Sequence, residues 1–159
     1  MKLFWICILV IAVVIILYVV IHRILINRAT MMVRRNAQQV TDKAVNESLA
    51  SLLGWHKTLS SEIVADVWGK GVLAFEYHFE SLTEQENEGR LTREQLAQQL
   101  TDYAKKHGIS AQQTKFPPFV ITDWWTYEQV LHIDVAYLTN EATIEYVEDL
   151  KRLKTDQTK

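Results

Sequence analysis

The chain has 159 residues, 48% of them hydrophobic, and a net charge of −2. Residues 1–41 carry five Lys and Arg and no acid, whereas residues 42–159 carry all 19 acids against 12 Lys and Arg. The acidic distal part excludes nucleic acid as an expected partner, because phosphate binding needs concentrated positive charge. The single cysteine, Cys7, excludes an intrachain disulfide and a cysteine-based metal site.

Residues 3–21 form an uninterrupted apolar run without a charged residue, Gly, Pro, Asn or Gln. A helix of this length crosses a hydrocarbon layer of ~30 Å. No small-residue cleavage site follows the run, which disfavours a cleaved signal peptide, and a core helix without a polar face is not expected in so small a protein. We therefore predict a transmembrane anchor over residues 1–26, with Trp5 and Tyr18 as interfacial aromatics.

The helical pattern continues beyond the anchor as a predicted stalk helix over residues 27–54, for which Gly54 offers a stop. Its apolar positions are spaced by three or four up to Leu53 and form one stripe. This stripe either packs on the distal domain or pairs with another helix. Four arginines that follow the apolar run are expected to contact anionic lipid headgroups: Arg23, Arg28, Arg34 and Arg35.

Residues 55–154 predict one small α+β domain, since about 100 residues suffice for a single core. A short helix is expected over residues 60–68. Residues 72–82 alternate between apolar and polar side chains and predict a strand. Residues 83–90 are rich in Glu and predict a loop.

A helix with clear end signals follows this loop. Thr92 is its predicted N-cap, Gln95 completes a capping box, and Gly108 ends the helix. Residues 120–127 and 130–138 then predict two strands.

Glu128 and Gln129 are the predicted turn between these two strands. Asn140 is the expected N-cap of a last helix, and residues 155–159 are expected to be a disordered tail. Because strands and helices segregate along the chain, the expected fold class is α+β, with a small antiparallel three-stranded sheet covered by helices on one face.

The polar faces of two predicted strands carry the residue types that bind metal ions. Glu76, His78 and Glu80 share one face of the first strand, and His132 and Asp134 share one face of the last. If the two strands were neighbours in register, these side chains would converge as metal ligands. The alternative is a solvated sheet face with alternating charge. Because nothing in the sequence determines the register, we expect the solvated face and no metal ion.

The aromatic residues near the third strand are the predicted contact surface for a partner. Trp124 and Trp125 are adjacent, so on a strand they point to opposite faces, and Phe116 and Phe119 lie nearby in the sequence. The alternative is that helices cover both faces of the sheet and make both tryptophans structural.

Catalytic and cofactor-binding motifs are missing from the sequence. There is no Gly-x-Ser-x-Gly, no Gly-rich phosphate loop and no His-x-x-x-His, and the only cysteine lies in the predicted anchor. We therefore expect no catalytic residues, no cofactor and no enzymatic activity.

The predicted plan, a transmembrane helix that continues as a stalk against a small sheet, resembles type IV pilin-like proteins. More narrowly, residues 27–49 are similar to the post-membrane helix of TadE-like and pseudopilin-like single-pass proteins of Gram-positive bacteria. The resemblance covers residues 1–53 and the overall plan, and no functional residue is carried over. It implies an extracytoplasmic distal domain and a role in a secretion, pilus or conjugation apparatus.

The expected function is that of a non-enzymatic, single-pass membrane protein that assembles with other membrane or envelope proteins, or with itself through the stalk helix. The alternative is a membrane-anchored sensor whose polar sheet face binds a metal ion or another ligand. The lipid bilayer is a partner in both hypotheses. Orientation is left open, because the arginines after the anchor favour a cytoplasmic distal domain under the positive-inside rule, against the resemblance.

Overall fold

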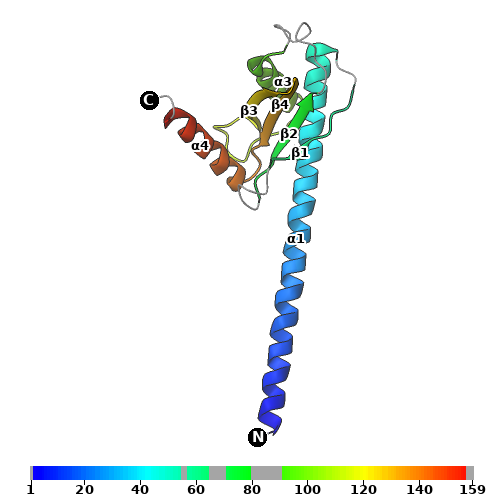
Figure 1. Cartoon of the computed structure of the whole chain (residues 1–159), viewed down its shortest axis with the longest axis vertical. Helices are drawn as coiled ribbons and strands as arrows, with labels where there is room; N and C mark the ends of the chain where they lie inside the picture. The colour runs from blue at the N-terminus through cyan, green and yellow to red at the C-terminus, as the bar shows by residue number, and fades with distance from the viewer. Residues whose placement is uncertain (1, 55–56, 65–70, 80–90, 157–159) are drawn as a thin grey trace. The chain divides into compact units, whose positions relative to one another are not determined.

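The structure is a computed structural model that describes residues 2–54, 57–64, 71–79 and 91–156. It contains a long N-terminal helix and a mixed helix–sheet region, labelled in Figure 1. The chain divides into two compact units, residues 1–35 and residues 36–159, and we describe each by itself. The boundary falls within the segment predicted as a stalk.

Helix α1 (Lys2–Leu53) matches the predicted helix closely. Its apolar N-terminal part is long and apolar enough to cross a membrane, and the most apolar stretch is not buried inside the structure. The prediction of a helix end at Gly54 is confirmed: this glycine has a φ of +64° and donates its backbone N–H to the carbonyl of Ala50 at 3.0 Å. An L residue would be strained at that φ, whereas glycine is not.

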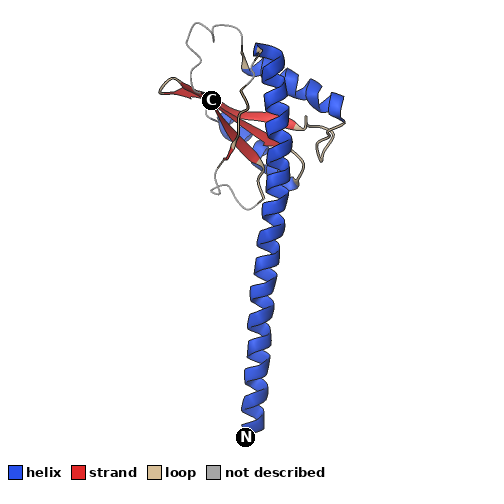
Figure 2. Ribbon diagram, turned by 90° about the vertical axis from the view of Figure 1, so that its right-hand side faces the viewer, coloured by secondary structure: helices blue, strands red, loops and turns tan. Residues whose placement is uncertain are grey.

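Within the described residues the sheet has four antiparallel strands in the order β1-β2-β4-β3 (Figure 2). They are β1 (Glu62–Ile63), β2 (Ala74–Phe79), β3 (Phe119–Tyr127) and β4 (Val130–Tyr137). The expected count of three strands is therefore corrected to four. The additional strand is β1, which pairs Glu62 with Glu76 and Ile63 with Phe75.

Strand β1 occupies part of the segment that we predicted as a short helix, because side chains of α1 hold this segment extended. Gln38 Nε2 donates to the carbonyl of Ser61 at 2.7 Å, and Ser61 Oγ donates to Asp42 Oδ1 at 2.6 Å. Asn46 forms two hydrogen bonds with the backbone of Leu59, at 2.7 and 2.8 Å. Ser61 is thus bonded to α1 and does not cap a helix.

Parts of three predicted segments lie outside the described residues. They are residues 65–68 of the short helix, residues 80–82 of the first predicted strand, and the whole loop at residues 83–90.

One face of the sheet, here called the inner face, packs against residues 37–53 of α1 and against α3 (Arg93–His107). The apolar stripe of the predicted stalk therefore packs on the distal domain from Ala37 onward. The α3 cap prediction is confirmed in full, with the Thr92–Gln95 capping box present and Gly108 left-handed at the C-terminus. The core of this face includes Val45, Leu49, Phe75, Tyr77, Leu96, Leu100, Ile133 and Val135.

The opposite, outer face packs against α4 (Glu141–Asp156) through a second cluster containing Ala74, Ala136, Ile144 and Val147. Figure 1 shows α4 and the C-terminal turns of α1 on opposite sides of the sheet. The expectation of helices on one face is thus corrected: both faces carry helices, because α4 has its own apolar stripe to bury.

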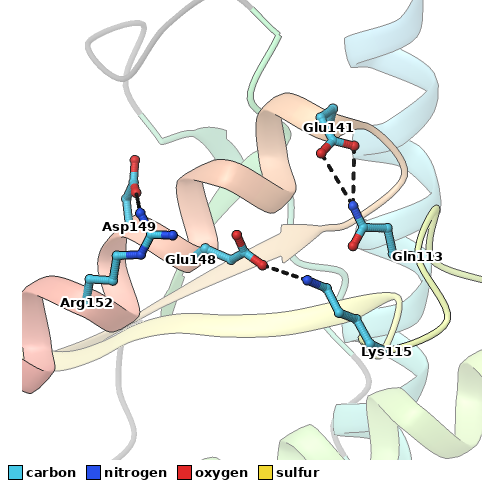
Figure 3. Close-up of polar contacts among 6 residues, drawn as sticks. All are labelled: Gln113, Lys115, Glu141, Glu148, Asp149 and Arg152. Carbon is cyan, nitrogen blue, oxygen red and sulfur yellow. Dashed lines mark hydrogen bonds and ion pairs between the residues drawn. The ribbon is translucent and has the colours of Figure 1, made fainter.

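Helix α4 is held at its start and along one side. The predicted N-cap is confirmed, since Asn140 Oδ1 accepts the backbone N–H of Thr143 at 2.9 Å. Figure 3 shows that the loop between α3 and β3 is bound to the helix, with Lys115 bound to Glu148 at 2.9 Å and Gln113 to Glu141 at 3.4 Å. The helix includes residues 155 and 156 of the expected tail, and residues 157–159 lie outside the described residues.

Candidate functional site

Helix α4 covers only one end of the outer face, where small side chains such as Ala74 and Ala136 meet it. Towards the other end the outer face is polar. Strand pairing between β2 and β4 places Glu76 opposite Asp134 and His78 opposite His132. Because side chains two residues apart share a face of a strand, these four lie on the same side of the sheet.

A single carboxylate oxygen lies between two imidazole rings at the centre of this polar area. Glu76 Oε1 is 2.9 Å from Nε2 of His78 and 2.8 Å from Nδ1 of His132. The two imidazole rings meet edge to face, with their centroids 4.7 Å apart. One donor atom from each of these three residues lies within 4.8 Å of the other two. We call these residues the His–Glu site.

The His–Glu site is partly open to solvent. The side chains of His78, Glu76 and His132 are 36%, 24% and 17% exposed, respectively. Burial alone would raise the pKa of Glu76, but the hydrogen bonds and electrostatic interactions with His132 and His78 outweigh it and lower the pKa. Glu76 is therefore a carboxylate near neutral pH and can bind a cation.

Trp125 forms one wall of the site. Its indole ring is stacked on the imidazole of His132, with centroids 4.9 Å apart and an angle of 14° between the planes. Trp124, the neighbouring residue, packs against the inner cluster. The two tryptophans thus point to opposite faces, as the sequence predicts.

Asp134 lies beside the site and is only 6% exposed. Its Oδ1 has no hydrogen-bond partner among the described residues. Burial, with the negative charges of Glu76 and Asp123, raises the pKa of Asp134 to about 7, against a smaller opposite effect of His78 and Lys154.

The structure brings together three of the five predicted metal-ligand candidates, Glu76, His78 and His132. It places a fourth, Asp134, opposite Glu76 on the same face of the sheet but outside this group of donor atoms. The fifth, Glu80, lies outside the described residues.

The four predicted contact aromatics do not form one exposed surface. Phe119 is buried in the inner cluster and stacked on Tyr137, with ring centroids 5.0 Å apart. Phe116 is half-buried in the outer cluster, where Lys115 and Lys151 lie over its ring. Trp125, at 36%, is the most exposed of the four.

The predicted membrane-proximal arginines all lie on α1 in the first unit. Arg23, Arg28 and Arg35 are exposed, and Arg34 is half-buried.

Two features of the structure were not predicted from the sequence. Trp125 was predicted to lie in a partner surface and not in the His–Glu site, and no contact was predicted for Gln38, Asp42 or Asn46. A two-residue turn at Glu128 and Gln129 already pairs Trp125 with His132, so this neighbour could have been found. No local signal points to the contacts between α1 and Ser61.

No family model matches this chain, and neither the curated proteins nor the solved structures compared with it include a match.

Proposed function

We propose that this chain is a single-pass membrane protein whose distal α+β domain is a non-enzymatic binding module of the sensor type. The ligand site is the polar end of the outer sheet face. One observation carries this proposal: α4 buries the small apolar end of that face and leaves Glu76, His78 and His132 partly exposed.

In this proposal the membrane anchor is residues 1–26, and its described part, residues 2–26, belongs to α1. Apolar length and the exposure of the described side chains support insertion into a bilayer, because exposed apolar residues of this number are not tolerated in water. The four arginines Arg23, Arg28, Arg34 and Arg35 lie at the headgroup level in this arrangement.

We propose an extracytoplasmic distal domain, on the resemblance to TadE-like and pseudopilin-like proteins. The arginine count favours the opposite side. Labelling of Ser110→Cys in a Cys7→Ser background with a membrane-impermeant maleimide distinguishes the two orientations, since Ser110 is exposed. Labelling in intact cells supports an extracytoplasmic distal domain, and labelling only after lysis shows that the domain is cytoplasmic.

The binding role is tested on the full chain in detergent micelles. Thermal unfolding is followed with a panel of separate probes, ZnCl₂, MgCl₂, sodium phosphate and sodium acetate. A ligand of the native state raises the midpoint. The proposal requires that at least one probe raises it for the wild type and not for His78→Ala. The matched control is His107→Ala, which removes a similar His–Glu pair from α3, 3.6 Å from Glu47. No shift with any probe contradicts the proposal.

A second candidate function is assembly with other copies or other envelope components of a secretion, pilus or conjugation apparatus. It is favoured by Met31, Met32 and Val33 of α1, which are 57%, 67% and 54% exposed beyond the predicted anchor. The simplest partner is a second copy. Oxidation of Met32→Cys in a Cys7→Ser background, in native membranes, then gives a dimer. Gln39→Cys, also exposed on α1, is the control that gives none.

A further inference from the structure

We infer, on the basis of the proposed binding role of the outer face, that Glu76, His78 and His132 bind a divalent transition-metal ion of the Zn²⁺ class. The proposed binding role leaves the ligand of the His–Glu site open, and this inference specifies it as a metal ion.

The donor set selects the class of metal ion. Two neutral imidazoles and one carboxylate are ligands of zinc and of its first-row neighbours. Calcium and magnesium prefer sites made of oxygen atoms alone. A site whose two nitrogen donors come from His78 and His132 therefore discriminates against both alkaline-earth ions.

The backbone holds the three donors in place. His78 and His132 are directly opposite each other on the paired strands β2 and β4, and Glu76 is two residues from His78 on the same face. All three ligands are thus on adjacent hydrogen-bonded strands near the centre of the sheet. Ligands on such rigid elements are positioned more accurately than ligands on loops.

The distances are close to those of a metal site. In a tetrahedral zinc site with bonds of ~2.0–2.1 Å, donor atoms lie ~3.3 Å apart. Glu76 Oε1 lies 2.9 and 2.8 Å from the two histidine nitrogens. Each of these separations must widen by about half an ångström to admit the ion, which small side-chain rotations provide.

The charges around the site provide a second, independent observation. Beside Glu76 lies the carboxyl group of Asp134, which is 6% exposed and whose Oδ1 has no hydrogen-bond partner among the described residues. A buried polar atom without a partner is costly, and a nearby dication compensates for it electrostatically. Asp134 is not among the three residues whose donor atoms lie within 4.8 Å of one another, so its role at the site is that of a neighbouring carboxyl group that attracts the ion.

Trp125 completes the surroundings of the site. Its indole ring is stacked on His132 and limits the orientations that this imidazole can adopt. Because His132 uses Nδ1 towards Glu76, its Nε2 is directed away from the donor set.

The test is isothermal titration of the full chain in micelles with ZnCl₂ after treatment with EDTA, supported by Co²⁺ absorption as a report of coordination geometry. We expect one ion per chain and an affinity at least about tenfold lower in His78→Ala and in His132→Ala. His107→Ala should leave the affinity unchanged. Circular dichroism establishes that each variant is folded, and Glu76→Gln, which keeps shape and removes charge, replaces any variant that is not.

Two results overturn the inference. One is zinc binding that is equal in the wild type, His78→Ala and Glu76→Gln. The other is the absence of zinc binding to folded wild-type protein at millimolar concentration. If phosphate or acetate nevertheless raises the unfolding midpoint in a His78-dependent manner, the metal assignment fails while the binding role stands. If no probe does so, both fail.

Discussion

Tyr77 on β2 donates its phenolic hydroxyl to Asp42 Oδ1 on α1 at 2.8 Å, and the same oxygen accepts Ser61 Oγ at 2.6 Å. One carboxylate thus joins α1, the segment before β1 and the strand β2. The Tyr77 side chain is fully buried, and burial with the nearby charge of Asp42 raises its pKa far above the ordinary value. Tyr77 therefore is a neutral hydrogen-bond donor near neutral pH.

The hydrogen bond between Tyr77 and Asp42 predicts that substitution of the acceptor lowers the free energy of unfolding more than substitution of the donor. Asp42→Ala leaves a buried hydroxyl without its acceptor and should lower the free energy of unfolding by about 1–3 kcal/mol. Tyr77→Phe removes only the donor and should cost about 0.5–1.5 kcal/mol. A double-mutant cycle, measured by chemical denaturation, should give a clear coupling energy between the two positions. Additive effects would contradict the shared hydrogen bond.

A pH dependence of stability follows from Asp134, whose folded pKa is raised from 3.8 to about 7. A carboxyl group with a raised folded pKa binds its proton more tightly in the native state. Its contribution to stability is then greatest below the unfolded pKa and is lost as pH rises towards 7.

Asp134→Asn, neutral at every pH, should therefore be more stable than the wild type at pH 8, by about 1–3 kcal/mol, and nearly equal to it below about pH 4. The measurement is denaturant unfolding at both pH values with EDTA present. The charged groups that face Asp134 are Glu76, His78, Asp123 and Lys154, with Tyr146 on α4 nearby. Asp123→Asn, at an exposed neighbour, is the control and should give a smaller difference.

The turn between β3 and β4 stores backbone strain. Glu128 and Gln129 have φ values of +47° and +65°, as a two-residue hairpin turn of the favoured twist requires. Glycine adopts this conformation without the penalty that other L residues carry. Gln129→Gly should raise the free energy of unfolding by about 0.5–1 kcal/mol, after its larger loss of chain entropy is included. Gln39→Gly, in an exposed position of α1, should lower it by a similar amount.

Removal of metal should destabilise the distal domain if the His–Glu site is a metal site. At a free Zn²⁺ concentration 100 times the dissociation constant, the bound ion stabilises the native state by about 2.7 kcal/mol. EDTA should therefore lower the unfolding midpoint of the zinc-loaded wild type and of His107→Ala, and should leave that of His132→Ala unchanged. An equal decrease in all three proteins would assign the effect of zinc to another part of the chain.

Local signals in the sequence predicted the helix ends and the turn that depend only on neighbouring residues. The capping box of Thr92 and Gln95, the left-handed Gly108 and the turn at Glu128 and Gln129 each need only a few neighbouring residues. The α+β class and the orientation of Trp124 and Trp125 to opposite faces followed from side-chain periodicity.

Features that depend on distant residues could not be predicted in the same way. Strand β1 has two residues, too few for any periodicity, and its extended form depends on Gln38 and Asp42 about twenty positions earlier. The His–Glu site depends on the pairing of β2 with β4, across more than fifty residues. The alternation of polar and apolar residues was compatible with β2 beside either β3 or β4. The sequence could therefore predict the metal ligands only on the condition that β2 and β4 are neighbours.

The packing of α1 determines where the chain can be divided. Ala44, Val45 and Leu49 are fully buried in the inner cluster, although they precede the first strand and belong to the same helix as the proposed anchor. A fragment that starts at residue 55 would lose these side chains and expose the inner face, whereas one that starts at residue 36 retains them. Proteolytic release of a folded distal fragment therefore requires cleavage inside the helix, upstream of its last five turns.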